Sequence, residues 1–401
     1  MDIVIFAHPR FSGSQSMPRF VNMLSQGMRQ RGNSVRVFRP EAVLSRLPAP
    51  RRIKKWLGYF DQYILFPVSV KKELRSCRPH TLFVFADQAL GPWVHLVSNQ
   101  PYIIHCHDFL AQHAAKGRIP GNQTGWSGRQ YQRLIFNGYS KGKHFISVSQ
   151  KTKEDLHSFL TAPPLDSEVI YNGINAAFKY RDPLSARKSF GKEIGHRLAG
   201  GYILHVGGNQ WYKNRIGVIE IYNAWRLNQN KVLPLIMVGK APDRKLRRSY
   251  ERSPYKTDIH LIVNLSDALM PFAYSGASVF LFPSLAEGFG WPIAEAMASG
   301  CPVVTTNSAP MTEVAGSAGF LIPIRPHGKG IASWADQSAL ILNNVLQLTQ
   351  KERRSAIEAG LLNARRFDSE SALNQIEKVY KKVLVHQKTS VARNARSKIK
   401  A

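Results

Sequence analysis

Two carboxylates and two glycines form the part of this sequence that is best suited to chemistry. Glu287 and Glu295 lie eight positions apart, and Gly288 and Gly290 closely follow the first of them. The glycines let backbone N–H groups approach a ligand closely, and the N-terminus of a helix that begins here favours an anion. These residues predict a site for an anionic ligand, although acidic residues are also common at helix starts that bind nothing.

Three elements must position these residues. The apolar run 279–282 suits a buried strand, Pro292 suits the first turn of a helix, and Gly300 suits the end of that helix. Glu287 would then lie in the loop at the carboxyl end of the strand, and Glu295 would lie one turn into the helix. Both side chains are therefore expected to point towards the same cleft.

Strands and helices alternate along almost the whole sequence, in two sets. The runs expected as strands are 3–7, 34–38, 81–86, 102–105, 144–148 and 168–170, then 202–206, 233–238, 260–263, 279–282 and 303–305. Such alternation predicts parallel sheets with helices on both faces. The fold class is thus α/β, with two Rossmann-like doubly wound domains. Ligands of such sheets bind beyond the carboxyl ends of the strands, so the site is expected in the cleft where the domains face each other.

The segment 287–304 resembles the signature of a known enzyme family. It matches the pattern E-G-F-G-x-P-x-x-E-A-M-A-x-G-x-P-V-V, and Asn307 with Glu313 and Val314 fits a further element downstream. The pattern resembles the E-x7-E signature of the retaining GT-B glycosyltransferases of family 4, the group related to glycogen synthase and bacterial α-mannosyltransferases. The resemblance implies a GT-B fold and transfer of a hexose from a nucleotide diphosphate sugar.

The resemblance also implies a role for each residue of this loop. Glu287 would bind hydroxyls of the donor sugar. The backbone around Gly288, Phe289 and Gly290 would hold the sugar and phosphate, and Glu295 would bind the ribose hydroxyls.

A second stretch, 203–209, resembles the first loop of the family's nucleotide domain and is followed by Lys213. The resemblance implies that Lys213 meets the donor diphosphate, where a cation stabilises the charge that grows on the leaving group. Gly208 and Asn209 would border the nucleotide sugar. They stand where the family often has an arginine, so Lys213 is expected to be the main cation of the loop.

Two weaker matches lie in the N-terminal half. Gly13 and Ser14 follow the first expected strand, where the family has a glycine-rich turn that borders the phosphate and the acceptor. His107 ends a strand in an H-D pair, as in the family, and would contact the transferred sugar. A histidine at a strand end is more often structural, as we expect of its neighbour His105.

The resemblance extends over most of the chain and implies a domain organisation. Residues 1–178 would bind the acceptor, and residues 179–368 would bind the nucleotide sugar. Residues 369–386 would form a helix that returns to the N-terminal domain. Residues 387–401 are basic and poor in apolar side chains, so we expect a disordered tail.

The resemblance implies retention of the anomeric configuration through an oxocarbenium-like transition state, in which Glu287 holds hydroxyls and is not a covalent nucleophile. The sequence has no D-x-D pair, the usual magnesium ligand set of the other main glycosyltransferase architecture. We therefore expect donor activation without a metal or a cofactor, through Lys213, backbone N–H groups and the helix dipole. No residue is identified as a general base, and the leaving phosphate is the candidate to take the acceptor's proton.

The formal net charge of +29, from 55 basic and 26 acidic residues, is the most unusual global property. A field of this sign attracts anionic lipids, acidic saccharides or nucleic acids. The stretch 51–60 mixes cations with aromatic side chains, as interfacial segments do. We therefore expect a cytoplasmic protein, peripheral at the inner membrane face, that uses a GDP- or UDP-linked sugar and a saccharide or lipid-linked acceptor. Its three cysteines, with no metal-binding spacing, fit a reducing compartment.

Two other functions stay open beside this one. A nucleic-acid-binding protein would explain the charge, but it would not explain the segment 287–295, and no helix-turn-helix, zinc-finger or RNA-sheet motif is visible. A nucleotide-sugar epimerase would use the same fold and need no acceptor. The favoured function is hexose transfer in the synthesis of a bacterial cell-surface polysaccharide or lipopolysaccharide.

Overall fold

The computed structural model describes residues 1–12, 16–227, 229 and 232–400. The chain divides into two compact units. The first unit comprises Met1–Tyr171 with Glu370–Ala401, and the second comprises Asn172–Ser369. Gly13 and Ser14, which the sequence predicts to border the donor phosphate, lie outside the described residues.

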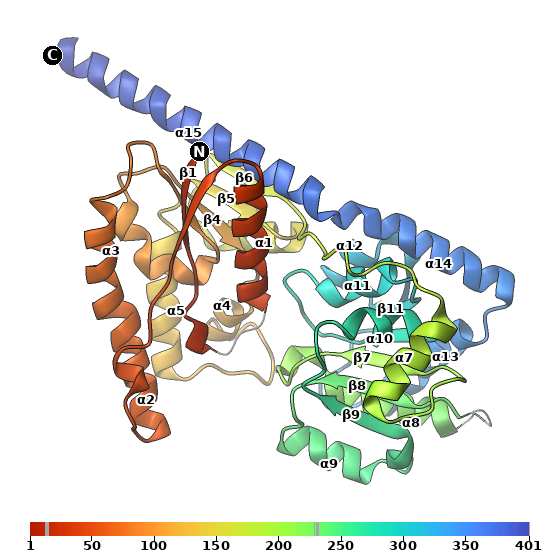
Figure 1. The fold of residues 1–401 in the computed structure, drawn as a ribbon. Helices are drawn as coiled ribbons and strands as arrows, with labels where there is room; N and C mark the ends of the chain where they lie inside the picture. The colour runs from red at the N-terminus through yellow and green to blue at the C-terminus, as the bar shows by residue number, and fades with distance from the viewer. Residues whose placement is uncertain (13–15, 228, 230–231, 401) are drawn as a thin grey trace. The chain divides into compact units, whose positions relative to one another are not determined.

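A six-stranded parallel sheet forms the centre of the first unit (Figure 1). The strand order is β2-β1-β3-β4-β5-β6, so the direction of winding reverses between β1 and β3. The inner strands are short apolar runs, and β3 is buried at every residue, as expected of strands that helices cover on both faces. The strands are β1 Asp2–Phe6, β2 Ser34–Phe38, β3 Leu82–Phe85, β4 Tyr102–Cys106, β5 His144–Ser147 and β6 Asp166–Val169.

Helices connect these strands, and α1 buries one apolar face. In α1 the buried residues Phe20, Leu24 and Met28 recur at helical spacing. α2 and α3 form one continuous helical rod, because a π-helical turn at Asp61–Leu65 joins them. The helices are α1 Ser16–Gln30, α2 Arg51–Phe60, α3 Phe66–Leu74, α4 Leu110–Ala115, α5 Trp126–Tyr139 and α6 Gln150–Phe159.

The second unit contains another six-stranded parallel sheet, of order β12-β11-β10-β7-β8-β9. The predicted class of two doubly wound α/β sheets is thus confirmed. The sequence predicts no strand at β12, because its run of three apolar residues is short. In the structure this strand is only partly buried. The strands are β7 Ile203–Val206, β8 Leu235–Gly239, β9 Ile259–Val263, β10 Val279–Phe282, β11 Val303–Thr306 and β12 Gly319–Ile322.

The core of the second unit lies between one face of its sheet and two helices, α8 and α13. Val218 and Trp225 of α8 pack with Leu342 of α13 in one cluster, together with Leu235 and Leu281 from the strands. The helices of this unit are α7 Pro183–Ile194, α8 Arg215–Leu227, α9 Arg244–Arg252, α10 Met270–Gly276, α11 Trp291–Ala298, α12 Met311–Ala315, α13 Ile331–Leu346 and α14 Gln350–Ala364.

The last helix, α15 Ser369–Lys400, is blue in Figure 1 and belongs mainly to the first unit. Its buried residues Leu373, Ile376, Tyr380 and Val383 recur at helical spacing. The helix continues where the sequence predicts a disordered tail from residue 387. Residues 387–400 contain no glycine or proline and many residues of high helix propensity, which favours this helix. Among the described residues, no helix combines the length and apolar character needed to span a membrane.

Candidate active site

The second unit has a binding edge of the kind that open parallel sheets use. Its winding reverses between β10 and β7, and ligands of such sheets bind at this switch point, beyond the carboxyl ends of the strands. Gly208, Asn209 and Lys213 lie in the loop after β7, and Glu287 lies in the loop after β10. The topology therefore joins two segments that are 74 residues apart in the chain.

Lys213 and Glu287 form a direct ion pair at this edge. The ammonium Nζ of Lys213 donates to both carboxylate oxygens of Glu287, at 2.7 and 2.9 Å. The two side chains are only 16% and 8% exposed. Because an unpaired charge is costly to bury, each side chain offsets the burial cost of the other.

The loop that carries Lys213 is fixed by the strand beside it. Lys213 ends a 3-10 turn that begins at Trp211. The next residue, Asn214, adopts a left-handed conformation with φ of 48°, and its amide donates to the carbonyl of Pro283 at 2.9 Å. The ammonium also lies 5.1 Å from the ring centroid of Phe282, the last residue of β10, where a cation–π attraction adds to the ion pair.

A second cation, Arg215, lies beside the same loop, and sequence reasoning missed it. Arg215 begins α8 and is buried. Its Nη1 donates to Asn209 Oδ1 at 2.6 Å and to the carbonyl of Lys240 at 2.9 Å, and burial lowers the pKa of its guanidinium. Arg215 thus places a second positive charge beside the loop that carries Lys213.

Glu295 lies in α11, at the predicted position within the helix. Its side chain is buried. Tyr274 of α10 donates its hydroxyl to Glu295 Oε2 at 3.1 Å. Sequence reasoning missed Tyr274, because the two residues lie 21 positions apart in different helices and no local pattern connects them.

The loop between Glu287 and α11 needs glycine and uses its aromatic residue for packing. Gly290 has a φ of 104°, which a residue with a Cβ adopts only with strain. The ring of Phe289 is buried against Trp291 and Phe367, with ring centroids 6.3 and 5.4 Å away. The backbone of Phe289, and that of Gly288 before it, is therefore the part that suits ligand contact.

His107 belongs to the first unit and directly follows β4. Its Nε2–H donates to the carbonyl of Ala86 at 2.9 Å, and its backbone N–H donates to Gln88 at 2.9 Å. Burial lowers the pKa of His107 in spite of the nearby carboxylate of Asp87. The ring is thus neutral near pH 7, with Nδ1 as its acceptor nitrogen. The neighbouring His105 is buried against Tyr380, in the packing role that the sequence predicts.

The switch point of the first unit carries a histidine–aspartate pair that sequence reasoning also missed. His8 follows β1 and Asp87 follows β3, and His8 Nε2 lies 2.9 Å from Asp87 Oδ2. Burial raises the pKa of Asp87, but the hydrogen bond and the ion pair with His8 lower it overall. In the sequence, His8 and Asp87 each closely follow an apolar run, and this pattern could have identified the pair.

Two family models match the chain. The model described as Glycosyltransferase Family 4 matches residues 17–178, and the model described as Glycosyl transferases group 1 matches residues 200–344. Together the two matches cover most of the chain.

Curated relatives include several mannosyltransferases. The O-antigen chain mannosyltransferase B of Escherichia coli is 32% identical over 185 residues, which are 45% of this chain and 46% of the relative. The chain thus spans about half the length of that relative. The phosphatidyl-myo-inositol mannosyltransferase of Mycobacterium leprae is 25% identical over 383 residues, 90% of this chain and 92% of the relative.

Solved structures share the fold at low sequence identity. The structure of HepE from Anabaena in complex with UDP and glucose has a TM-score of 0.71 and 18% identity, over 95% of this chain and 100% of the other. The fold is that of the GT-B glycosyltransferases. With both family models matched in order along this fold, the chain belongs to the glycosyltransferases, with a family 4 domain followed by a group 1 domain.

Proposed function

We propose that this chain transfers a hexose, with mannose as the first candidate, from a nucleotide diphosphate sugar to a saccharide or lipid-linked acceptor of a bacterial surface polysaccharide. The observation that carries the proposal is the buried Lys213–Glu287 pair at the switch point of a glycosyltransferase fold. The similarity to mannosyltransferases supports the sugar and the acceptor class. The likeness to a structure with UDP and glucose supports the donor class.

The ion pair suits the departure of a nucleoside diphosphate. Cleavage of the glycosidic bond places negative charge on the leaving group, and a cation fixed beforehand stabilises that charge. The ammonium of Lys213 has three N–H donors, and Glu287 accepts two hydrogen bonds from it. One donor is left for a diphosphate oxygen, while the carboxylate holds the ammonium in place and accepts from a sugar hydroxyl.

The remaining residues of the site position the donor. In this proposal Glu295 accepts hydrogen bonds from the ribose hydroxyls, and Tyr274 orients the carboxylate. The backbone N–H groups around Gly288 and Gly290 and the N-terminus of α11 hold phosphate. His107, with its neutral ring, binds a hydroxyl of the transferred sugar. The transfer retains the anomeric configuration, and Lys213 performs the charge stabilisation for which other architectures use a metal.

Donor binding and transfer can be tested together. Thermal shift with GDP-mannose, UDP-glucose and UDP-N-acetylglucosamine identifies the donor, and transfer is then followed with an oligosaccharide acceptor. We expect Glu287→Gln to lower the transfer rate by at least about 100-fold, whereas Glu251→Gln, on the exposed face of α9, leaves it unchanged. Equal rates in both variants would contradict the proposal. Conversion of the donor without any acceptor would favour an epimerase.

A second part of the proposal is that the enzyme works at an anionic membrane surface. On the helical rod 51–74, the large apolar side chains of one row are exposed, and Trp56 is 70% exposed. Lys54 and Lys55 of α2 are exposed beside them. Apolar side chains with flanking cations are typical of helices that lie in the lipid interface. The exposed row is Ile53, Trp56, Phe60, Ile64 and Val68.

Flotation with liposomes tests the membrane contact. We expect binding to vesicles with anionic lipid, weaker binding to neutral vesicles, and loss of most binding in the double variant Trp56→Ser, Phe60→Ser. Trp126→Ser is the control, because Trp126 is equally exposed but lies on α5. Equal binding to neutral vesicles would contradict the preference for an anionic surface, and binding to neither kind would contradict a membrane role.

A further inference from the structure

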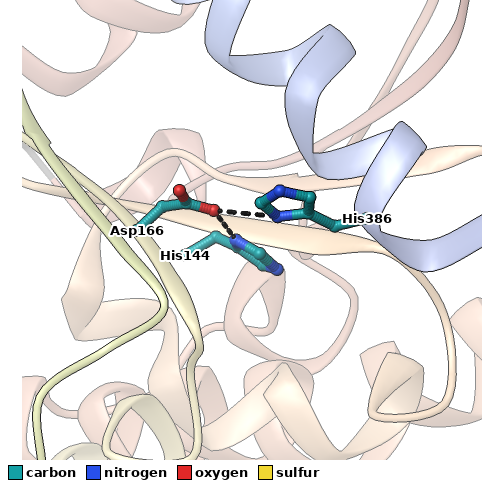
Figure 2. A group of neighbouring side chains, drawn as sticks. All are labelled: His144, Asp166 and His386. Atoms are coloured by element: carbon teal, nitrogen blue, oxygen red, sulfur yellow. Dashed lines mark hydrogen bonds and ion pairs between the residues drawn. The ribbon is translucent and has the colours of Figure 1, made fainter. Parts of the chain in front are cut away.

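Three side chains with metal-binding atoms lie together in the first unit (Figure 2). His144 Nδ1 lies 2.6 Å from Asp166 Oδ2, and His386 Nδ1 lies 3.4 Å from the same oxygen. Their ligand atoms all lie within 4.8 Å of one another. Within the described part of the chain, no other group of three His, Cys, Asp or Glu side chains is this close.

The fold brings these residues together from distant parts of the sequence. His144 and Asp166 are the first residues of β5 and β6 and are direct partners in the parallel register, so their side chains project from the same face of the sheet. β6 is the edge strand, and α15 packs beside it. Lys382 and His386 of α15 both contact Asp166, because residues four apart share one face of a helix.

We propose that His144, Asp166 and His386 bind one divalent transition-metal ion, with zinc as the best-suited ion. Two imidazole nitrogens and one carboxylate oxygen are a known ligand set for zinc, with water in the fourth position. A small outward movement of the side chains gives three ligand atoms the spacing that an ion requires. The imidazole ring centroids are already 5.9 Å apart and tilted by 38°.

Lys382 is the feature that could argue against an ion, and its position is compatible with one. Lys382 contacts the other carboxylate oxygen, Oδ1 of Asp166, and lies 3.9 Å from Glu168. An ion bound through Oδ2 alone leaves that contact intact, and metal-bound carboxylates commonly keep such an outer hydrogen bond. The side chain of His386 is 46% exposed, which gives an ion an entry path.

The position in the fold indicates a structural role for this metal. His144 and Asp166 begin their strands, whereas His8, Asp87 and His107 follow the carboxyl ends of theirs. The site therefore lies at the amino ends of the strands, whereas the candidate catalytic residues of this unit lie at the carboxyl ends. An ion here would fasten α15 to the edge strand β6 and would stabilise the folded state by mass action.

Zinc uptake by the full chain without an affinity tag tests the proposal. After removal of metals with EDTA, calorimetric titration with zinc should show one ion per chain, and zinc should raise the melting temperature. We expect His386→Ala to bind zinc at least about 100-fold more weakly, because loss of even an outer-shell partner costs 10–100-fold. His95→Ala, at an exposed histidine elsewhere in the first unit, should bind zinc like the wild type.

The outcomes separate a designed site from chance binding. Wild-type affinity in His386→Ala, or no stoichiometric binding by the wild type, would mean that the three residues are only an ion-pair cluster. Melting in EDTA shows whether the variant is folded, and we expect it to be, since Tyr380 and Val383 still anchor α15. Asp166→Asn is a second variant with the same expected loss. These experiments measure zinc binding and not sugar transfer, so their outcome is independent of the proposed function.

Discussion

Lys213 and Glu287 depend on each other because both are largely buried. We expect Lys213→Met to lower the free energy of unfolding by about 3 kcal/mol, since removing one partner of a buried pair leaves an uncompensated charge. Transfer should fall by at least about 100-fold, because the leaving diphosphate loses its cation. Urea unfolding and initial rates measure the two effects.

The double variant Lys213→Met, Glu287→Gln separates stability from activity. It removes both charges, so most of the lost stability should return while transfer stays low. If the double variant loses the sum of the two single losses, the residues do not act as a pair.

Asp61 is a second residue whose charge matters, this time for folding. Its buried carboxylate accepts hydrogen bonds from the backbone of Val43, Leu44 and Ser45 and from the Ser45 hydroxyl, at 2.6 to 3.2 Å. Burial raises the pKa of Asp61, but these bonds lower it overall below the ordinary 3.8. The carboxylate therefore stabilises the fold fully above about pH 4, and this contribution is lost as the pH falls through the lowered folded value.

We expect Asp61→Asn to lower stability at neutral pH by about 1–3 kcal/mol, because its amide cannot accept all four hydrogen bonds. The difference from the wild type should shrink as the pH falls below about 4. Denaturant unfolding at several pH values measures this. Asp267→Asn, at an exposed position, is the control, and an unchanged difference at low pH would contradict the assignment.

At the scale of single residues, the sequence predicted where the site residues lie in the fold better than which side chains they contact. The glycine pattern and the apolar run place Glu287 at a strand end, because those signals are local. Tyr274 and Arg215 could not be predicted, since their contacts with Glu295 and Asn209 depend on how separate elements pack. The functional roles of these residues stay predictions.

At the scale of elements, the strands that helices cover on both faces are the most predictable, because they are continuous apolar runs. β12 at the sheet edge was not predicted, because its apolar run is short and the strand is only partly buried. For residues 387–400 two sequence signals disagree, because low apolar content favours a disordered tail, whereas helix propensity and the absence of glycine and proline favour the end of α15.

A buried polar contact between Tyr380 and His105 helps to hold α15 in the first unit. The hydroxyl of Tyr380 lies 2.8 Å from His105 Nε2, and burial lowers the pKa of His105 to about 3. We expect Tyr380→Phe to destabilise the protein by about 1–3 kcal/mol, because it leaves a buried ring nitrogen without its partner.

Thermal unfolding of Tyr380→Phe should be compared with that of Val385→Ala, a change at a 60% exposed position of the same helix. Equal melting temperatures for the two variants would show that the contact contributes nothing.

At the scale of the whole molecule, each unit repeats the same arrangement of a doubly wound sheet with polar residues at its switch point. We expect a saturating nucleotide sugar to slow hydrogen exchange at residues 207–214 and 287–295, because their backbone N–H groups lie at the proposed donor site. Exchange measured by mass spectrometry tests this. A donor that raises the melting temperature without protecting either segment would place its site elsewhere.

The π-helical turn at Asp61–Leu65 governs the geometry of the exposed apolar row. A π turn holds more residues than the 3.6 of an α turn, so side chains spaced four apart stay in line instead of drifting around the axis. Ile64 and Val68 thereby continue the line of Trp56 and Phe60. Deleting one residue within the turn would return it to the 3.6-residue geometry of an α turn, while hardly changing composition or charge.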